Sequence, residues 1–210
     1  MELFKRMPTH IGIIPDGNRR WADERGFPKR DGYSEGIKPG FELYEIMLEY
    51  GIHEATFYGF TKDNNKRAVD QREAFTKACV DAVKLLSGRD ANLLVIGNTD
   101  SVAFPPELKE YANKRVHFGR GLVNINFLVN YDWEWDLKNM IKNNRIASSE
   151  IPRIDLIIRW GGRRRLSGFL PVQSVYSDFY IIDDYWPSFN KSQFLSAIRW
   201  YQDCDVTLGG

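Results

Sequence analysis

The 210-residue chain has nearly balanced charge, with 29 Lys and Arg against 28 Asp and Glu and a formal net charge of +1. Such a balance gives no global positive field for gathering a polyanion, so the sequence predicts no nucleic-acid partner and only local anion-binding sites. No Gly/Ser-rich, Pro-rich or single-sign charged tract interrupts the chain, and its length suits one domain with a full core over residues 1–210.

The cysteines and the start of the chain bear on the compartment. Cys79 and Cys204 fit neither a disulfide framework nor a metal cluster, which indicates a reducing environment. The first strand-like segment begins near Thr9, so we expect no signal peptide, and no apolar run approaches the roughly 20 residues that span a bilayer. The sequence therefore predicts a cytoplasmic protein without a transmembrane segment.

Short apolar runs, most of them continuous rather than alternating, recur along the chain. They cover residues 10–14, 55–60, 93–97, 122–129, 154–158 and 179–182. Continuous runs are typical of strands buried on both faces, as in a parallel sheet.

Apolar stripes at helical spacing lie between these runs. The stripes are Ile37, Phe41, Tyr44 and Leu48, then Phe75, Cys79, Val83 and Leu86, and, after a capping Asn190, Phe194, Ile198 and Tyr201. We expect such stripes to face the core, without a chemical role. Alternating strands and helices predict an α/β fold, in which ligands sit at the carboxyl ends of strands.

The first loop that could carry chemistry is residues 15–21, directly after the first run. Gly17 permits a backbone that points successive N–H groups into one concavity, Asp16 offers a hard oxygen for Mg²⁺, and Arg20 adds a fixed positive charge. These groups suit a metal-bound diphosphate. Taken alone, Asp-Gly-Asn is also an ordinary turn sequence.

The second loop, residues 61–67, follows the second run. Thr61 and Asn64 can hydrogen-bond a substrate or water, and Arg67 can bind an anion. By itself, this loop is better explained as a polar helix entrance with capping residues.

The third loop, residues 159–167, carries four arginines in seven residues beside the Gly161-Gly162 pair. A solvated basic loop does not usually need two adjacent glycines or follow a buried strand. A diphosphate site uses both a flexible backbone and forked guanidinium donors, so the functional interpretation is favoured here.

In order and spacing, the three loops resemble the signature of cis-prenyltransferases, the family of undecaprenyl diphosphate synthase. Residues 10–22 resemble the opening strand and the Asp-Gly-Asn-x-Arg-Trp-Ala loop, and residues 58–67 resemble the Phe-Ser-x-Glu-Asn-x-x-Arg segment. Residues 155–189 carry Asp-Leu-Ile-Ile-Arg, Gly-Gly, Arg-Leu-Ser-x-Phe-Leu and Trp-Pro-Ser-Phe where the family has them. The resemblance covers nearly the whole chain.

The resemblance implies a Mg²⁺-dependent prenyltransferase that condenses an allylic with a homoallylic diphosphate. It implies a central, mainly parallel six-stranded sheet flanked by helices, with a hydrophobic tunnel for the growing chain. It also implies a homodimer, with a heterodimer as the alternative.

Roles for individual residues also follow from the resemblance. Asp16 would coordinate the metal, with Asp178 at an acidic position near the subunit boundary and the metal. The proposed catalytic residues are Asp16, Arg20 and Asn64. The allylic diphosphate site would contain Gly17, Asn18, Arg19, Arg20 and Trp21, with Lys29 or Arg30 as a further basic residue. The remaining substrate-binding residues would be Thr61, Arg67, Arg159, Arg163, Arg165 and Ser167.

Three departures from the family pattern point to an unusual product. Arg163 stands where the family commonly has Glu after Gly-Gly, and the family's C-terminal Arg-x-Gly appears as Thr207-Leu208-Gly209. The chain is also short, and the strand at 127–129 is bulky, which predicts a small tunnel and a short product. The altered residue after Gly-Gly also fits the lavandulyl diphosphate synthase-like branch, which joins two dimethylallyl units in non-head-to-tail fashion.

Two alternatives stay open. The chain could be the partner subunit of a heteromeric cis-prenyltransferase that makes a polyprenyl carrier lipid. Such partners typically lack the metal Asp and keep the C-terminal Arg-x-Gly, whereas this chain shows the reverse. It could also be a terpene synthase, or a prenyl transferase to another acceptor, using the same ionisation step and the same loops.

Overall fold

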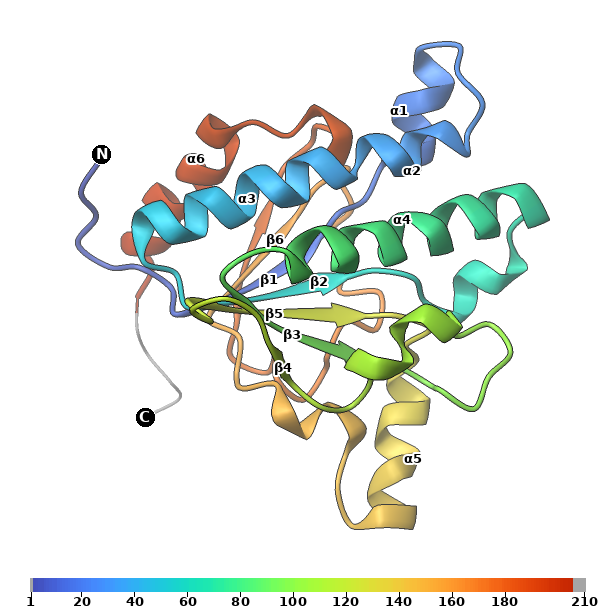
Figure 1. The fold of residues 1–210 in the computed structure, drawn as a ribbon. Coiled ribbons are helices and arrows are strands. Elements are labelled where there is room, and N and C mark those ends of the chain that lie inside the picture. The colour runs from blue at the N-terminus through green and yellow to red at the C-terminus, as the bar shows by residue number, and fades with distance from the viewer. Residues whose placement is uncertain (1, 206–210) are drawn as a thin grey trace.

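The computed structural model describes residues 2–205, which fold around one seven-stranded sheet (Figure 1). The strands are β1 (His10–Ile14), β2 (Glu54–Tyr58), β3 (Ala91–Ile96), β4 (Val116–His117), β5 (Val123–Leu128), β6 (Leu156–Arg159) and β7 (Asp178–Ile181). Their order across the sheet is β4-β3-β5-β2-β1-β6-β7, and every neighbouring pair except β3–β4 is parallel.

The predicted α/β fold with a mainly parallel sheet is confirmed, with one strand more than expected. Each apolar run corresponds to one parallel strand, and β1, β2 and β3 are buried along their whole length. The additional strand, β4, has two residues and pairs antiparallel at the sheet edge. A segment that short has no alternation to detect, because the pattern needs four or more residues.

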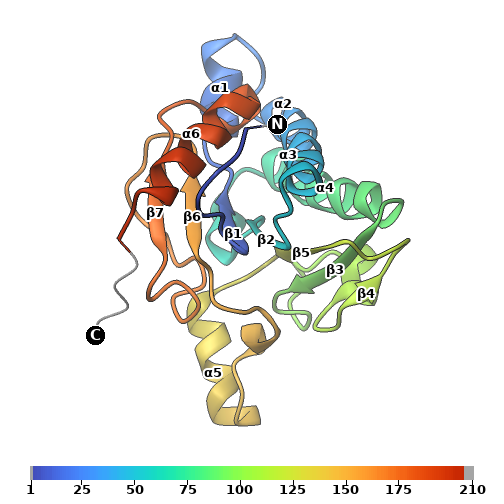
Figure 2. The same ribbon diagram turned by 90° about the vertical axis from the view of Figure 1, so that its left-hand side faces the viewer.

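Helices cover both faces of the sheet. The α-helices are α1 (Asn18–Glu24), α2 (Asp31–Glu35), α3 (Ile37–Tyr50), α4 (Val69–Ser87), α5 (Trp133–Asn143) and α6 (Lys191–Gln202). Short 3₁₀ helices are η1 (Lys62–Lys66), η2 (Pro106–Tyr111), η3 (Ala147–Glu150) and η4 (Trp186–Ser188). Figures 1 and 2 show α3, α4 and α6 on one face and α5 on the opposite face. No helix within residues 2–205 is long and apolar enough to cross a membrane.

The start of α6 shows how local sequence sets an element boundary. The Asn190 side chain accepts the Gln193 backbone N–H at 3.1 Å, and the Gln193 side chain accepts the Asn190 backbone N–H at 3.2 Å. This reciprocal capping box satisfies two N–H groups that would otherwise lack partners. The predicted apolar face, Phe194, Ile198 and Tyr201, is buried.

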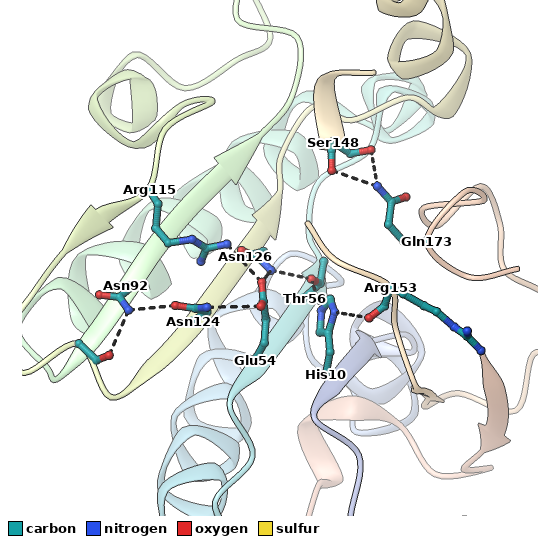
Figure 3. A network of polar contacts seen from close by, with 11 residues as sticks. His10, Glu54, Thr56, Asn92, Arg115, Asn124, Asn126, Ser148, Arg153 and Gln173 are labelled. Carbon is teal, nitrogen blue, oxygen red and sulfur yellow. Dashed lines mark hydrogen bonds and ion pairs between the residues drawn. The ribbon is translucent and has the colours of Figure 1, made fainter. Parts of the chain in front are cut away.

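A polar network links β1, β2 and β5 across one face of the sheet (Figure 3). His10 Nδ1 donates to the Arg153 carbonyl at 3.1 Å, so its Nε2 accepts the Thr56 hydroxyl at 2.8 Å. The Asn126 amide donates to Thr56 at 2.9 Å and to Glu54 at 2.7 Å. Each donor therefore meets an acceptor only if His10 is neutral. His10 therefore has a structural role in this network.

Stability should fall on acidification because of His10. Burial lowers the pKa of His10, against the opposing charges of Glu54 and Asp155. Below a pH of about 6.5 the unfolded chain binds a proton at His10, whereas the folded chain does not yet bind it. The free energy of unfolding that His10 contributes above that pH is therefore lost as the pH falls. Urea denaturation between about pH 7 and pH 5 should show a shallower pH dependence for His10→Gln than for the wild type. Equal slopes would contradict this assignment.

Candidate active site

The loop after β1 makes a turn that requires glycine. Gly17 has φ of 101°, and a Cβ there would lie 2.5 Å from the Tyr185 ring. The Gly17 N–H donates to Asp16 Oδ1 at 2.6 Å, and α1 begins at the next residue. This geometry fixes the Asp16 carboxylate beside the start of a helix.

Asp16 joins the first predicted loop to the third. Its Oδ2 accepts from Arg159 at 2.8 Å, and its Oδ1 lies 3.4 Å from the Arg20 guanidinium. The Arg159 side chain is only 5% exposed, whereas that of Asp16 is 34% exposed. A partly exposed carboxylate held by a buried guanidinium retains lone pairs for a ligand.

Arg159, the last residue of β6, in turn organises the third loop. Its guanidinium donates to the Arg165 carbonyl and, at 3.0 Å, to Ser167 Oγ. The Tyr58 hydroxyl donates to the Ser167 carbonyl at 2.8 Å, and burial raises the pKa of Tyr58, which keeps it a neutral donor. The loop is thereby held against the ends of β2 and β6.

The three loops enclose one polar cleft of about 520 Å³ at the carboxyl ends of β1, β2 and β6. The predicted site residues that line it are Asp16, Gly17, Asn18, Arg19, Arg20, Lys29, Thr61, Asn64, Arg67, Arg159, Arg163, Arg165 and Ser167. Seven of the lining side chains are basic and three are acidic. Such a local surplus of positive charge in a concave site suits a polyanionic ligand, although the whole chain is nearly neutral.

An apolar pocket of about 80 Å³ adjoins the cleft, between α3, α4 and the sheet. The residues that line both cavities are Pro15, Asn18, Tyr33, Gly59 and Phe75. Ile37, Phe41 and Cys79 line the apolar pocket, so the helical stripes that we expected to serve only the core also form this pocket.

Residues 14–209 match the family model described as "Putative undecaprenyl diphosphate synthase". The chain belongs to this family of cis-prenyltransferases. It is a prenyl diphosphate synthase, as the names of its relatives also indicate.

Curated relatives of the prenyltransferase span nearly its whole length. A ditrans,polycis-undecaprenyl-diphosphate synthase, (2E,6E)-farnesyl-diphosphate specific, from Buchnera aphidicola is 32% identical over 99% of this chain and 94% of that protein. A tritrans,polycis-undecaprenyl-diphosphate synthase, geranylgeranyl-diphosphate specific, from Thermoplasma volcanium is 31% identical over 96% of this chain and 90% of that protein. These two named activities differ in substrate, so family membership leaves the substrate of this prenyltransferase open.

A solved structure shares the fold. Lavandulyl diphosphate synthase from Lavandula x intermedia, in complex with dimethylallyl diphosphate, superposes with a TM-score of 0.79 at 21% identity, covering 97% of this chain and 98% of that chain. This likeness confirms the cis-prenyltransferase fold of the prenyltransferase.

The prenyltransferase cleft also contains an aromatic wall that sequence reasoning missed. Tyr33 and Phe75 stack with ring centroids 4.6 Å apart, and Arg67 donates to the Tyr33 hydroxyl at 2.7 Å. Burial lowers the pKa of Arg67 and raises that of Tyr33, so the phenol stays neutral and accepts the bond. Tyr33 follows no strand, and Phe75 belongs to a helical stripe, so neither falls under the strand-end rule.

Three predicted site residues do not line the cleft of the prenyltransferase. Trp21 stacks on Phe27, with ring centroids 6.2 Å apart, and Arg30 lies 3.5 Å from Asp31. Asp178 is the first residue of β7, so it lies at the amino ends of the parallel strands. The cleft lies at their carboxyl ends, on the other side of the sheet's length. Within one chain, Asp178 therefore does not join Asp16 in a metal site.

The cleft residues of the prenyltransferase suit a Mg²⁺ ion that is held by a single carboxylate. Residues 2–205 contain no group of three or more His, Cys, Asp or Glu that could hold a metal. Mg²⁺ is commonly held by one or two carboxylates plus substrate phosphates, and it keeps several waters. Asp16, partly exposed on the cleft wall, meets that need.

The charge-reversed position after Gly-Gly also faces the cleft. Arg163 lines it, and Gly161 and Gly162 have φ of 85° and 70°. A Cβ on Gly161 would lie 2.6 Å from the Arg20 guanidinium, so the first glycine allows the two loops to approach. Residues 207–209, which stand in place of the family's Arg-x-Gly, lie outside the described residues.

Proposed function

We propose that this prenyltransferase uses Mg²⁺ to ionise a short allylic diphosphate and joins its hydrocarbon unit to a second five-carbon diphosphate, giving a short product. The main support for this proposal is the basic cleft that opens onto a small apolar pocket. The cleft offers charge for two diphosphates, and the pocket of about 80 Å³ offers a small apolar space for a hydrocarbon unit.

The first step breaks the bond between the allylic C1 and its oxygen, and the electron pair leaves with the diphosphate. Arg19, Arg20 and the N–H groups at the start of α1 neutralise the charge that develops on the leaving oxygens. Asp16 would hold Mg²⁺, which supplies further positive charge to that diphosphate. Arg159, Arg163, Arg165 and Ser167 grip the second diphosphate.

The second step forms a carbon–carbon bond with electrons from the double bond of the second substrate. The resulting cation loses a proton, and the products are the joined diphosphate, inorganic diphosphate and the proton. Asn64 Oδ1 accepts the Thr61 backbone N–H at 3.0 Å, so Asn64 fixes this loop. A neutral amide is a weak base, which makes an oxygen of the released diphosphate the better proton acceptor.

Water must be kept from the allylic cation, and the apolar lining serves this need. The Tyr33–Phe75 wall stands where the polar cleft passes into the apolar pocket, with both rings lining both cavities. An allylic unit whose diphosphate lies on the Gly17 loop would place its hydrocarbon past this wall.

We also propose that two copies of the chain assemble as a homodimer. Exposed apolar side chains gather on α5, including Leu137, Met140 and Ile141. The neighbouring loop exposes Val172 and Val175, and Gln173 between them bonds to η3 after α5. Light scattering should give twice the mass of one chain, and a single-chain mass would contradict the proposal.

The product spectrum tests the function. Purified protein would be incubated with Mg²⁺ and dimethylallyl diphosphate, with and without isopentenyl diphosphate. Product from dimethylallyl diphosphate alone would identify non-head-to-tail condensation, and product only with isopentenyl diphosphate would identify the head-to-tail reaction. Chains of many isoprene units would contradict the short product. Absence of product in both reactions would favour the partner-subunit alternative.

A further inference from the structure

A second polar pocket, of about 270 Å³, lies beside the active-site cleft. It is lined chiefly by Lys62, Asn65, Asn98, Asn130, Asp132 and Lys138. The 3₁₀ helix η1 separates the two cavities, because Asp63 and Asn64 line the cleft whereas Lys62 and Asn65 line the second pocket.

The topology favours a ligand site at this place. The pocket residues follow β2, β3 and β5 at their carboxyl ends. After β2 the chain continues into α4 on one face of the sheet, and after the adjacent β5 it continues into α5 on the opposite face (Figure 1). Crevices between strands whose connections diverge in this way are the usual ligand sites of open α/β sheets.

The hydrogen bonds among the pocket residues leave more donors than acceptors without a protein partner in the described part of the chain. Asn98 Oδ1 accepts the Asp100 N–H at 3.2 Å, and Ser101 Oγ accepts the Ala103 N–H at 3.2 Å. Buried Asn130 donates to the Asn98 carbonyl at 3.1 Å and accepts from Asn65 at 3.4 Å. Within residues 2–205, the Asn98 amide N–H groups and the Ser101 hydroxyl find no acceptor. Asn98 and Ser101 are half-buried, so these donors are open to water and are available to bind an anion.

The charges point the same way. Lys62 Nζ lies 2.9 Å from Asp132 Oδ2, and Asp132 Oδ1 accepts the Glu134 N–H that begins α5. The one carboxylate of the pocket is therefore already engaged. Lys138 makes no ion pair with any residue in the described part of the chain, which leaves one unbalanced positive charge.

We infer that this second pocket binds a small phosphate-type anion, as inorganic diphosphate or as the headgroup of a prenyl diphosphate. The unpaired Lys138 ammonium and the free Asn98 and Ser101 donors would contact its oxygens. Prenyl transfer releases inorganic diphosphate, so the enzyme's own reaction supplies such an ion. Trp135 is the one large apolar side chain among the lining residues, which favours the free ion over a headgroup with its hydrocarbon tail.

Titration calorimetry with inorganic diphosphate in Mg²⁺-free buffer tests the inference. The wild type should show two classes of site per chain, one in the cleft, which has room for two diphosphates, and one in the second pocket. Lys138→Gln should weaken one class about tenfold, because a charge-assisted hydrogen bond is lost. Arg165→Gln should weaken the other class. The matched control is Lys142→Gln, an exposed lysine one turn further along α5, which should leave both classes unchanged.

A single class of site in the wild type, or identical isotherms for the wild type and Lys138→Gln, would overturn the inference. Thermal denaturation of the lysine variants shows whether they fold like the wild type. A titration with dimethylallyl thiolodiphosphate separates the two sources of anion. If this analogue fills both classes, the pocket takes prenyl headgroups; if it fills one class while inorganic diphosphate fills two, the pocket takes the free ion.

Discussion

Replacing Asp16 by Asn should lower prenyl transfer about 10²–10³-fold, because it removes charge stabilisation worth several kcal/mol at the leaving diphosphate. Asp16 uses different oxygens for the Gly17 N–H and for Arg159, so Asn, with one carbonyl oxygen, can keep only one of these two bonds. Arg159 still keeps its bonds to the Arg165 carbonyl and Ser167. We therefore expect a modest drop in the melting temperature and a far larger loss in kcat with Mg²⁺.

Asp23→Asn is the matched control for this experiment. Asp23 lines the same cleft, but its side chain is 63% exposed, and it pairs only loosely with Lys29 at 3.6 Å. Its replacement should change the rate by much less than that of Asp16. Wild-type activity in Asp16→Asn, or equal losses in both variants, would remove Asp16 from the metal site.

Shortening Phe41 should lengthen the product. Phe41 lines the apolar pocket from α3, and its ring is covered by the Arg89 guanidinium at 4.6 Å from the centroid. Tightly packed interiors leave little spare volume, so Phe41→Ala opens space that a longer chain can fill. Chromatography of the products with saturating isopentenyl diphosphate should show a shift by one or more isoprene units.

Leu48→Ala separates this effect from general loosening of α3. Leu48 lies on the same helix and packs against the core, but it does not line the pocket. In both variants the free energy of unfolding should fall, by about 2–5 kcal/mol at most for a large-to-alanine change. Only Phe41→Ala should change the product, and an unchanged product spectrum would show that the pocket does not limit chain length.

The fold was predictable where burial leaves a long signal. The run 10–14 is β1, and the stripe from Ile37 to Leu48 lies within α3, because strands buried on both faces and amphipathic helices impose periods that span many residues. β4 is two residues long and left no such pattern. The capped start of α6 was predictable because capping is local.

The site was predictable where its residues directly follow strands. Asp16 and Thr61 come just after strands and Arg159 ends one, and the structure brings their loops together in one cleft. Tyr33 reaches the cleft from α2 and Phe75 from α4, and only the packing of those helices brings them there. Asp178 follows no strand but starts one, and the parallel pairing of β7 with β6 places it at the amino ends of the strands, away from the cleft.

The most direct test of the proposed function is a crystal structure with Mg²⁺ and dimethylallyl thiolodiphosphate. We expect the diphosphate on the Gly17 loop and Arg20, Mg²⁺ on Asp16, and the hydrocarbon past Tyr33 and Phe75 in the apolar pocket. A diphosphate bound away from the Gly17 loop, or a hydrocarbon that points into solvent, would contradict it.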